Sequence, residues 1–211
     1  MKRLGWLFAC LMWAGAAHAA LPASEIPMYG DAAKSKTLKE SDAAYIASIE
    51  KSGKSRRDVA KEVMRTGWAA YQKGDLKTAI RRFNQAWLLD PENGDAYHGF
   101  ALISTVRDKN STDAEKFFRI ALSKPGVNEA AYVSYGRFLW LVGRLDESLA
   151  QLQKALEVSA AAHNARSEIA MVYYKKKDFA NACEFARRAR DNKDDLMPNF
   201  LEEMCKQGAT G

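Results

Sequence analysis

Residues that support metal sites and disulfide-rich domains are scarce in this sequence. Its 211 residues include three Cys, three His and five Pro, and no two histidines have the HxxxH or HExxH spacing of a zinc-binding helix. These numbers exclude a zinc module and a dense disulfide framework, and we expect no metal and no other cofactor. The sequence also lacks GxSxG, phosphate-loop and dinucleotide-binding motifs. We therefore expect that the protein is not an enzyme.

A strong excess of charge of one sign is missing as well. Lys and Arg number 32 and Asp and Glu number 26, which gives a formal net charge of +6. Because the charges are mixed along the chain, we expect no nucleic-acid partner. The densest basic cluster is interspersed with Asp178 and Glu184 and is interpreted as a solvated helix face; its members are Lys175, Lys176, Lys177, Arg187, Arg188 and Arg190.

Long apolar runs are confined to the first 20 residues. Lys2 and Arg3 precede an uncharged apolar run over 4–17, and Ala17-His18-Ala19 has the small-x-small pattern of a secretory cleavage site. We predict a signal peptide over residues 1–19, cleavage after Ala19 or Ala20, and a mature chain in the periplasm without stable membrane insertion.

Two other interpretations of this segment are weaker. An uncleaved anchor is disfavoured because the 14 apolar residues of the run are too short for a hydrocarbon core of about 30 Å. Leu7-Phe8-Ala9-Cys10 resembles a lipoprotein cleavage box only weakly, since Phe8 is bulky and very few residues precede Cys10.

Residues 20–58 form a leader with one helix. Prolines and a glycine predict an irregular start. The capping-box pattern of Thr37-Leu38-Lys39-Glu40 then predicts a helix over 38–52, which ends at Gly53. Ser55 is expected to cap the next helix. The apolar face of the leader helix is expected to consist of Tyr45, Ile46 and Ile49.

From residue 60 onwards, small residues recur at intervals of 34 or 35 in two series. The first series is Gly67, Ala101, Gly136 and Ala170, and the second is Ala79, Ala114, Ser148 and Ala182. Four and seven residues after each member of the second series stand further apolar residues, which mark one face of a helix; they are Phe83 and Ala86, Phe118 and Ala121, Leu152 and Ala155, and Ala186 and Ala189. Turn residues separate the two series, so each unit is predicted to be helix, turn, helix.

At these positions the sequence resembles the tetratricopeptide repeat family, whose period is 34 residues. The match is almost complete in the first unit, from Gly67-Trp68-Ala69-Ala70-Tyr71 to Pro91, and nearly as good over 129–162, with Ser148 in place of the usual Ala. The resemblance implies an all-α, right-handed superhelical solenoid of about four repeats over 59–206, with the leader helix covering its first end. A C-terminal capping helix is expected to carry Leu196, Met197, Phe200, Leu201 and Met204, and 207–211 to be a disordered tail.

A second stripe runs along the first helix of each repeat. In the family that the chain resembles, these positions line a concave groove that holds a protein or peptide partner; they are Met64, Trp68, Tyr71, His98, Leu102, Val133, Arg137, Trp140, Met171, Tyr174 and Lys175. Trp, Tyr, Met and Arg are enriched at interfaces. The alternative is that Trp68, Trp140 and Tyr174 are extra packing. If the stripe binds a partner, replacing Trp68 and Trp140 by Ala abolishes binding and leaves helicity and melting largely unchanged.

Two cysteines remain outside the predicted signal peptide. Cys183 lies on the second helix of the last repeat and Cys205 on the expected capping helix. In an oxidising compartment they form a disulfide if their Cα atoms come within about 7 Å. The alternative is two separately buried thiols.

Three functions follow from these patterns. The first is a non-enzymatic protein-interaction module of the cell envelope that binds a partner in the groove. The second is an envelope assembly factor for pili or secretion, because exported repeat arrays of this kind resemble type IV pilus biogenesis proteins. The third is a regulatory subunit of a periplasmic enzyme. The sequence indicates no oligomeric state.

Overall fold

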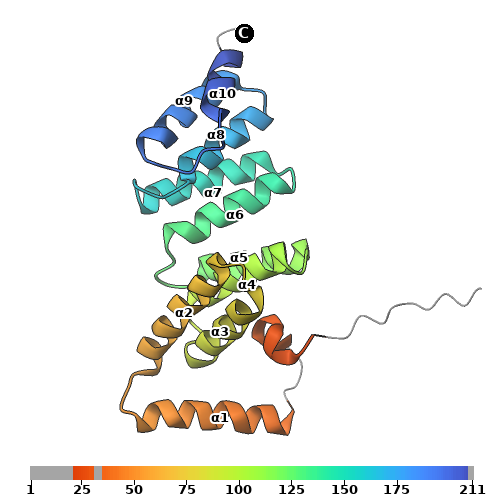
Figure 1. Cartoon of the computed structure of the whole chain (residues 1–211), viewed down its shortest axis with the longest axis vertical. Helices are drawn as coiled ribbons and strands as arrows, with labels where there is room; N and C mark the ends of the chain where they lie inside the picture. Colours follow the sequence, from red (N-terminus) through yellow and green to blue (C-terminus); the bar gives the residue numbers. More distant parts are fainter. Residues whose placement is uncertain (1–20, 31–34, 209–211) are drawn as a thin grey trace, which may run out of the picture.

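A computed structural model of the chain describes residues 21–30 and 35–208. Within these residues all regular structure is helical, and the helices stack along one long axis with α1 at one end and α10 at the other (Figure 1). The expected all-α solenoid is confirmed. The predicted signal peptide and its cleavage site lie outside the described residues.

Four helix pairs form the body of the stack. The first helices of the pairs are α2 (Arg56–Gln72), α4 (Gly94–Val106), α6 (Glu129–Leu141) and α8 (Ala165–Lys175). The second helices are α3 (Leu76–Leu89), α5 (Ser111–Ser123), α7 (Leu145–Val158) and α9 (Phe179–Asp191). Successive first helices contact one another, so α2, α4, α6 and α8 share one face of the stack.

Short polar residues cap the N-termini of most of these helices, because the first backbone amides of a helix need hydrogen-bond acceptors. The Asp75 carboxylate accepts a hydrogen bond from the Thr78 amide at 3.0 Å, and Asn93, Asn110, Asn128 and Asp178 cap later helices in the same manner. The turn between α2 and α3 contains Gly74 in the left-handed region (φ 76°), whereas Lys177 occupies the corresponding place before α9. The fourth repeat therefore accepts a backbone conformation that glycine adopts more easily.

The small residues of the first series allow the helices of a pair to approach closely. A Cβ on Gly136 of α6 would lie 2.6 Å from Leu152 Cγ of α7. Phe83 of α3 lies against Gly67 of its own pair and also against Gly99 of α4 in the next pair, and Cβ atoms added to these glycines would lie 2.7 and 2.6 Å from its ring. These contacts build the core, which runs from the leader helix into α6 and continues as smaller clusters to α10.

The leader helix begins earlier than the sequence pattern predicted. Helix α1 covers Lys36–Lys51, and the hydroxyl of Ser35, not that of Thr37, accepts the capping hydrogen bond from the Leu38 amide at 3.3 Å. Thr37 lies inside the first turn, so the predicted capping box is wrong. Ser55 does precede α2, but its side chain makes no capping hydrogen bond.

The capping helix begins later than predicted, because α10 covers Phe200–Gly208. Pro198 disfavours the helical conformation at the residue before it, so Leu196 and Met197 precede the helix, and Met197 is 56% exposed. Phe200 and Met204 are buried against the last pair. The predicted tail is also wrong at its start, since residues 207 and 208 are helical.

Cys183 of α9 and Cys205 of α10 are bonded, with a Cα–Cα distance of 4.6 Å. This is the first of the two arrangements that the sequence left open. No helix in the described part of the chain combines the length and the apolar composition that crossing a membrane requires.

Candidate protein-binding groove

Three clefts on the face shared by the first helices meet at Arg137. The first has a volume of about 240 Å³, the second about 250 Å³ and the third about 140 Å³. Arg137 of α6 lines all three. Together they form one groove that extends from the end of α2 across α4, α6 and α8 to the start of α10, and we call it the inner groove.

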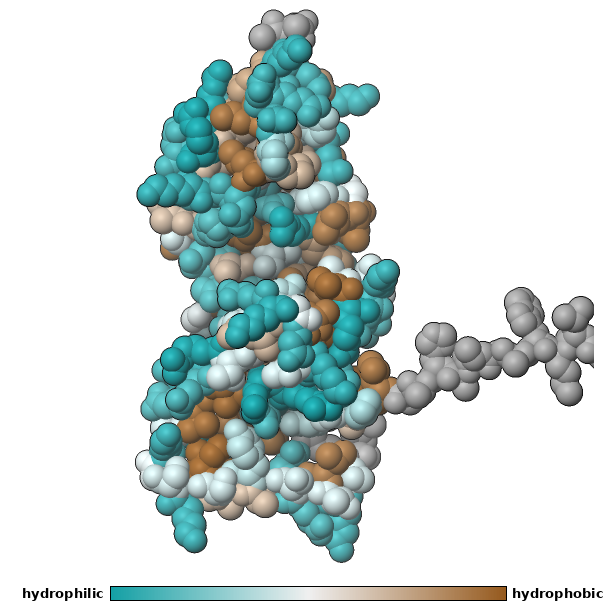
Figure 2. Space-filling view, in the orientation of Figure 1, coloured by the Kyte–Doolittle hydropathy of each residue, from teal (hydrophilic) through white to brown (hydrophobic). Residues whose placement is uncertain are grey.

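The end of the inner groove nearest α2 is apolar and open to solvent. Leu141 is 57% exposed and Val106 is 50% exposed, and both lie beside Leu102, Tyr71 and Phe138. On the face drawn in Figure 2 most of the surface is hydrophilic, and apolar surface gathers in separate patches. Exposed aliphatic side chains that share a cleft favour the binding of apolar groups.

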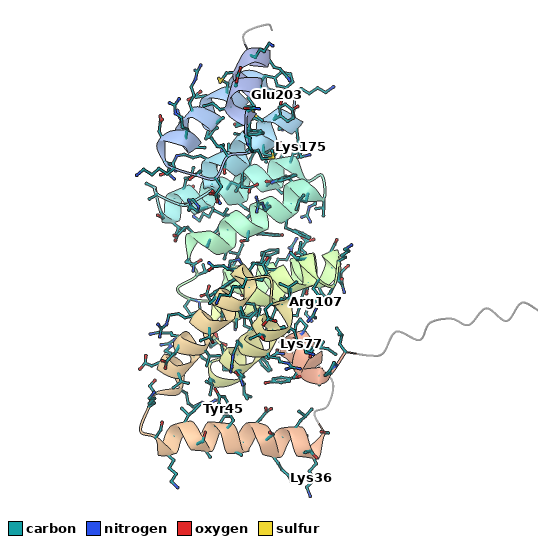
Figure 3. All side chains as sticks on the ribbon, viewed as in Figure 1. Lys36, Tyr45, Lys77, Arg107, Lys175 and Glu203 are labelled. Carbon is teal, nitrogen blue, oxygen red and sulfur yellow. A yellow bond between two sulfur atoms is a disulfide. The ribbon has the colours of Figure 1, made fainter. Side chains whose placement is uncertain are left out.

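The opposite end combines apolar and charged groups. Met171 of α8, the segment before α10 and Phe200 line the third cleft together with Trp140. The Trp140 indole N–H donates to Glu168 Oε2 at 2.7 Å, and the Lys175 ammonium lies 4.9 Å from the centre of the Trp140 ring. Lys175 projects from the end of α8 (Figure 3).

Glu168 anchors the middle of the groove. Its carboxylate is buried and lies 2.7 Å from Arg137 Nε, while most of the Arg137 side chain stays exposed. Burial raises the pKa of the Glu168 carboxyl, against the opposing effects of Arg137 and Trp140. A buried carboxylate that binds two donors fixes their orientation, so the guanidinium of Arg137 is held toward the groove and remains accessible to a partner.

The repeat geometry agrees with the comparisons to known proteins. Residues 136–196 match the model of the tetratricopeptide repeat family. The fold is a tetratricopeptide repeat solenoid.

Several solved structures are similar to this chain in fold. PilF of Pseudomonas aeruginosa is 21% identical, with a TM-score of 0.65 over 74% of this chain and 71% of that protein. PilW, a widely conserved type IV pilus biogenesis factor, is 13% identical, with a TM-score of 0.56 over 83% of this chain and 89% of its own. YrrB, a tetratricopeptide repeat protein with an unusual peptide-binding site, is 18% identical, with a TM-score of 0.50 over 79% of this chain and 91% of YrrB. No protein of curated function matches the sequence.

The inner groove brings together part of the predicted stripe. The clefts are lined by Tyr71, Leu102, Val133, Arg137, Trp140 and Met171. Tyr174 lies half-buried against the rings of Phe179 and Phe200, with centroid distances of 5.7 and 6.3 Å. Lys175 joins the site through its contact with Trp140.

Two residues of the predicted stripe belong to the core, so their assignment to the groove is wrong. Met64 and His98 are buried, and neither lines one of the three clefts. These two side chains pack inward because α1 and the first two pairs share one large core.

Trp68 has the packing role that the sequence left as the alternative. Its ring centroid lies 5.0 Å from that of Phe83 and 4.9 Å from that of His98. Its indole N–H donates to Asp95 Oδ2 of the next repeat at 3.3 Å. Replacing Trp68 is therefore expected to cost stability, and the Trp68 and Trp140 double variant is not a clean test of binding.

The sequence interpretation missed Val106 and Leu141, the two exposed aliphatic residues at the apolar end of the groove. Each stands four residues after a predicted stripe position, Leu102 and Arg137 respectively. A continuation of the i, i+4 spacing into the last turn of each helix was the signal that could have found them.

Proposed function

We propose that this protein is an interaction module of the cell envelope that binds an extended segment of a partner protein in the inner groove. One observation carries the proposal: Arg137, held by Glu168, lies between the open apolar end of the groove and the third cleft, which is lined by Trp140 and Met171. Groups of this kind orient and anchor a bound chain. The partner segment then places apolar side chains on either side of Arg137.

The polar groups of the inner groove define the rest of the partner's chemistry. Arg137 is able to donate to a main-chain carbonyl or a carboxylate of the bound segment. Glu129, Glu168 and Asp195 lie along the same groove, so an acidic segment would be repelled on both sides of Arg137. An apolar segment with few acidic residues fits the groove best.

A place in the periplasm is part of the proposal. The secretory pattern of residues 1–19 supports export, and the Cys183–Cys205 disulfide is of the kind that persists in oxidising compartments. A role in pilus assembly is the second candidate, favoured by the fold that this chain shares with PilF and with the pilus biogenesis factor PilW.

Photo-cross-linking in cells tests the groove. A photoreactive amino acid at Leu141 is expected to cross-link one envelope protein in the periplasmic fraction, where mass spectrometry identifies it. The purified partner is then titrated against the chain with Val106→Glu and Leu141→Glu by calorimetry. Both side chains are about half exposed, so the double variant should fold normally and bind at least about tenfold more weakly.

Val158 supplies a matched control. It is an exposed valine at the end of α7, 46% exposed, and it lines none of the three clefts. Val158→Glu should leave the affinity unchanged, and a photoreactive residue there should not yield the same cross-link. Equal cross-linking at both positions, or full affinity of the Val106 and Leu141 double variant, would refute the groove assignment.

A further inference from the structure

Residues 21–30, here called the N-terminal segment, lie on the outer side of the first repeat. The segment folds into two short turns, Ala23–Glu25 and Pro27–Gly30, which contact α3, a second helix that does not line the inner groove. Figure 3 shows Lys77 and Arg107 beside it. Its contacts include directed hydrogen bonds and ion pairs in addition to apolar packing.

The backbone of the segment is held by hydrogen bonds from two side chains. Asn84 of α3 is 0% exposed, and its Nδ2 donates to the carbonyl of Ser24 at 3.1 Å and to that of Ile26 at 2.9 Å. Arg107, which follows α4, donates from Nη2 to the carbonyl of Glu25 at 2.8 Å. Three consecutive carbonyls are therefore bound by residues that stand 58 to 82 positions away in the chain.

The side chains of the segment have their own partners on α3. The buried carboxylate of Glu25 lies 2.5 Å from Arg81 Nη2 and 3.4 Å from Lys77 Nζ. Burial alone would raise the pKa of this carboxyl, but the hydrogen bonds from Arg81 and Lys77 outweigh it and hold the pKa below its ordinary value. Tyr29 is buried as well, with its ring 6.3 Å from that of Trp87.

Asn84 has no counterpart in the other repeats. One, two and three repeats later the same position is occupied by Arg119, Gln153 and Arg187, all of which are exposed. A fully buried amide on the outer surface of a second helix is favourable only when another segment covers it. The first repeat thus carries a side chain whose use is to hold a peptide backbone.

The N-terminal segment satisfies this site incompletely. Asn84 Oδ1 and Arg107 Nη1 are buried and have no hydrogen-bond partner among the described residues. Met28 and Tyr29 also adopt left-handed backbone conformations, with φ of 51° and 58°, which non-glycine residues disfavour. These features limit how tightly the segment is held and leave a donor and an acceptor that a bound peptide can use.

We propose that the outer face of α3, together with Arg107, is a second peptide-binding site whose resident ligand is exchangeable. It recognises a short turn-forming peptide through three consecutive carbonyls and one central carboxylate. The N-terminal segment occupies it in the same chain, and the same segment of a second copy replaces it. The site is independent of the inner groove.

A chain cut between the segment and α1 tests the exchange. Residues 31–34 are replaced by a protease recognition sequence and cleaved after folding, so that every other residue of the protein is retained. A fluorescent peptide with the sequence of residues 21–30 is then added and its anisotropy is measured. We expect saturable binding to the cut protein and much weaker binding to the uncut protein, where the tethered segment competes at high effective concentration.

Two substitutions on α3 show whether the peptide enters the proposed site. Arg81→Glu should weaken peptide binding at least about tenfold, because the charge-assisted bond to Glu25 is lost. Arg82→Glu is the matched control, since Arg82 is the next residue on the helix and its side chain donates to Gln85 instead. Compared with the peptide that contains Glu25, a Glu25→Gln peptide should bind more weakly. The loss should be the same for the cut Arg82→Glu protein and for the cut protein without a substitution.

Three results would overturn the proposal. In the first, the cut protein retains its own segment and the fluorescent peptide never exchanges into it, which would make the segment a permanent part of the fold. In the second, release of the segment abolishes the helical circular dichroism signal. Equal affinity of the Arg81→Glu and Arg82→Glu proteins would also exclude this site.

Discussion

At the scale of single residues, His98 shows how strongly burial changes chemistry in this molecule. The side chain lies between the rings of Trp68 and Phe118, at centroid distances of 4.9 and 6.2 Å. Neither ring nitrogen has a hydrogen-bond partner in the described part of the chain, although Asp95 Oδ1 lies 4.0 Å from Nδ1. Burial lowers the pKa of His98 to about 4.

This lowered pKa predicts an acid-dependent loss of stability. The unfolded chain binds a proton at His98 near its ordinary pKa of 6.5, whereas the folded chain binds it only near 4. His98 therefore contributes no penalty above pH 6.5, and the free energy of unfolding falls as the pH decreases from 6.5 to 4. The expected loss from this residue is about 3 kcal/mol at pH 4. Urea unfolding at a series of pH values measures it.

The variant His98→Leu isolates the contribution of this residue. Its apolar side chain suits the surrounding aromatic rings, so the protein should stay folded at pH 7. Its stability should depend less on pH between 6.5 and 4 than that of the unaltered protein. If the free energy of unfolding depends on pH in the same way in both proteins, the imidazole of His98 is not the cause of the loss of stability at low pH.

At the scale of helices, the distance between the members of a pair is set by matched residue sizes. In the third repeat Gly136 lies directly against Leu152, whereas in the fourth repeat Ala170 and Ala186 occupy the same two positions. All four residues are buried. A smaller residue on one helix is thus paired with a larger one on the other, or both are of intermediate size.

Gly136→Ala is expected to destabilise the protein, although alanine has the higher helix propensity. Its Cβ would overlap Leu152, and overpacking of a core typically costs about 1–3 kcal/mol, against a propensity gain of about 1 kcal/mol. Leu152→Ala alone should cost about 2–5 kcal/mol through the cavity it leaves. Denaturant unfolding measures both single variants.

The double variant reproduces the Ala–Ala pair of the fourth repeat and tests the size-matching explanation. Since the new methyl group occupies part of the space left by the leucine, the double variant should lose less stability than the two single variants together. Strict additivity of the two losses would show that the residues do not share this space.

At the scale of the whole molecule, a stack of repeats is vulnerable at its ends, because the terminal repeat has a neighbour on one side only. Helix α10 covers the last pair with Phe200 and Met204, and the Cys183–Cys205 disulfide fastens it to α9. The two cysteines are 22 residues apart in the sequence. The short α10 is thereby kept on the stack by a covalent bond as well as by packing.

Removing this bond should loosen the C-terminal end first. In the chain-entropy account, closing a loop of this length stabilises a fold by roughly 3 kcal/mol. Replacing both cysteines by Ser should therefore lower the free energy of unfolding by up to about this amount. Amide hydrogen exchange should accelerate in α10 before it does in α4.

Unfolding in the presence of a thiol reductant supplies the control for this prediction. The reductant should destabilise the unaltered protein and leave the double serine variant unchanged. If the reduced and the oxidised protein unfold at the same denaturant concentration, the disulfide contributes nothing to the stability of the stack.

The repeat architecture follows from local patterns in the sequence. Contacts within a pair depend on residues at fixed short spacings, so Gly136 and Ser148 appear in the sequence as part of a periodic pattern, and helix pairs follow from that pattern. The local start of each pair follows in the same way from its cap and turn residues. The error at the start of α1 arose because Ser35 and Thr37 were both able to cap the helix.

Which stripe residues line the groove, and what covers the outer surface, depended on how the helix pairs pack against one another. His98 and Leu102 lie on one helical stripe, but neighbouring pairs bury the first and leave the second in the groove, because the angle between pairs is not encoded in spacing along one helix. Asn84 holds carbonyls about 60 residues away. No local pattern records such a contact, since its two halves meet only after the chain has folded.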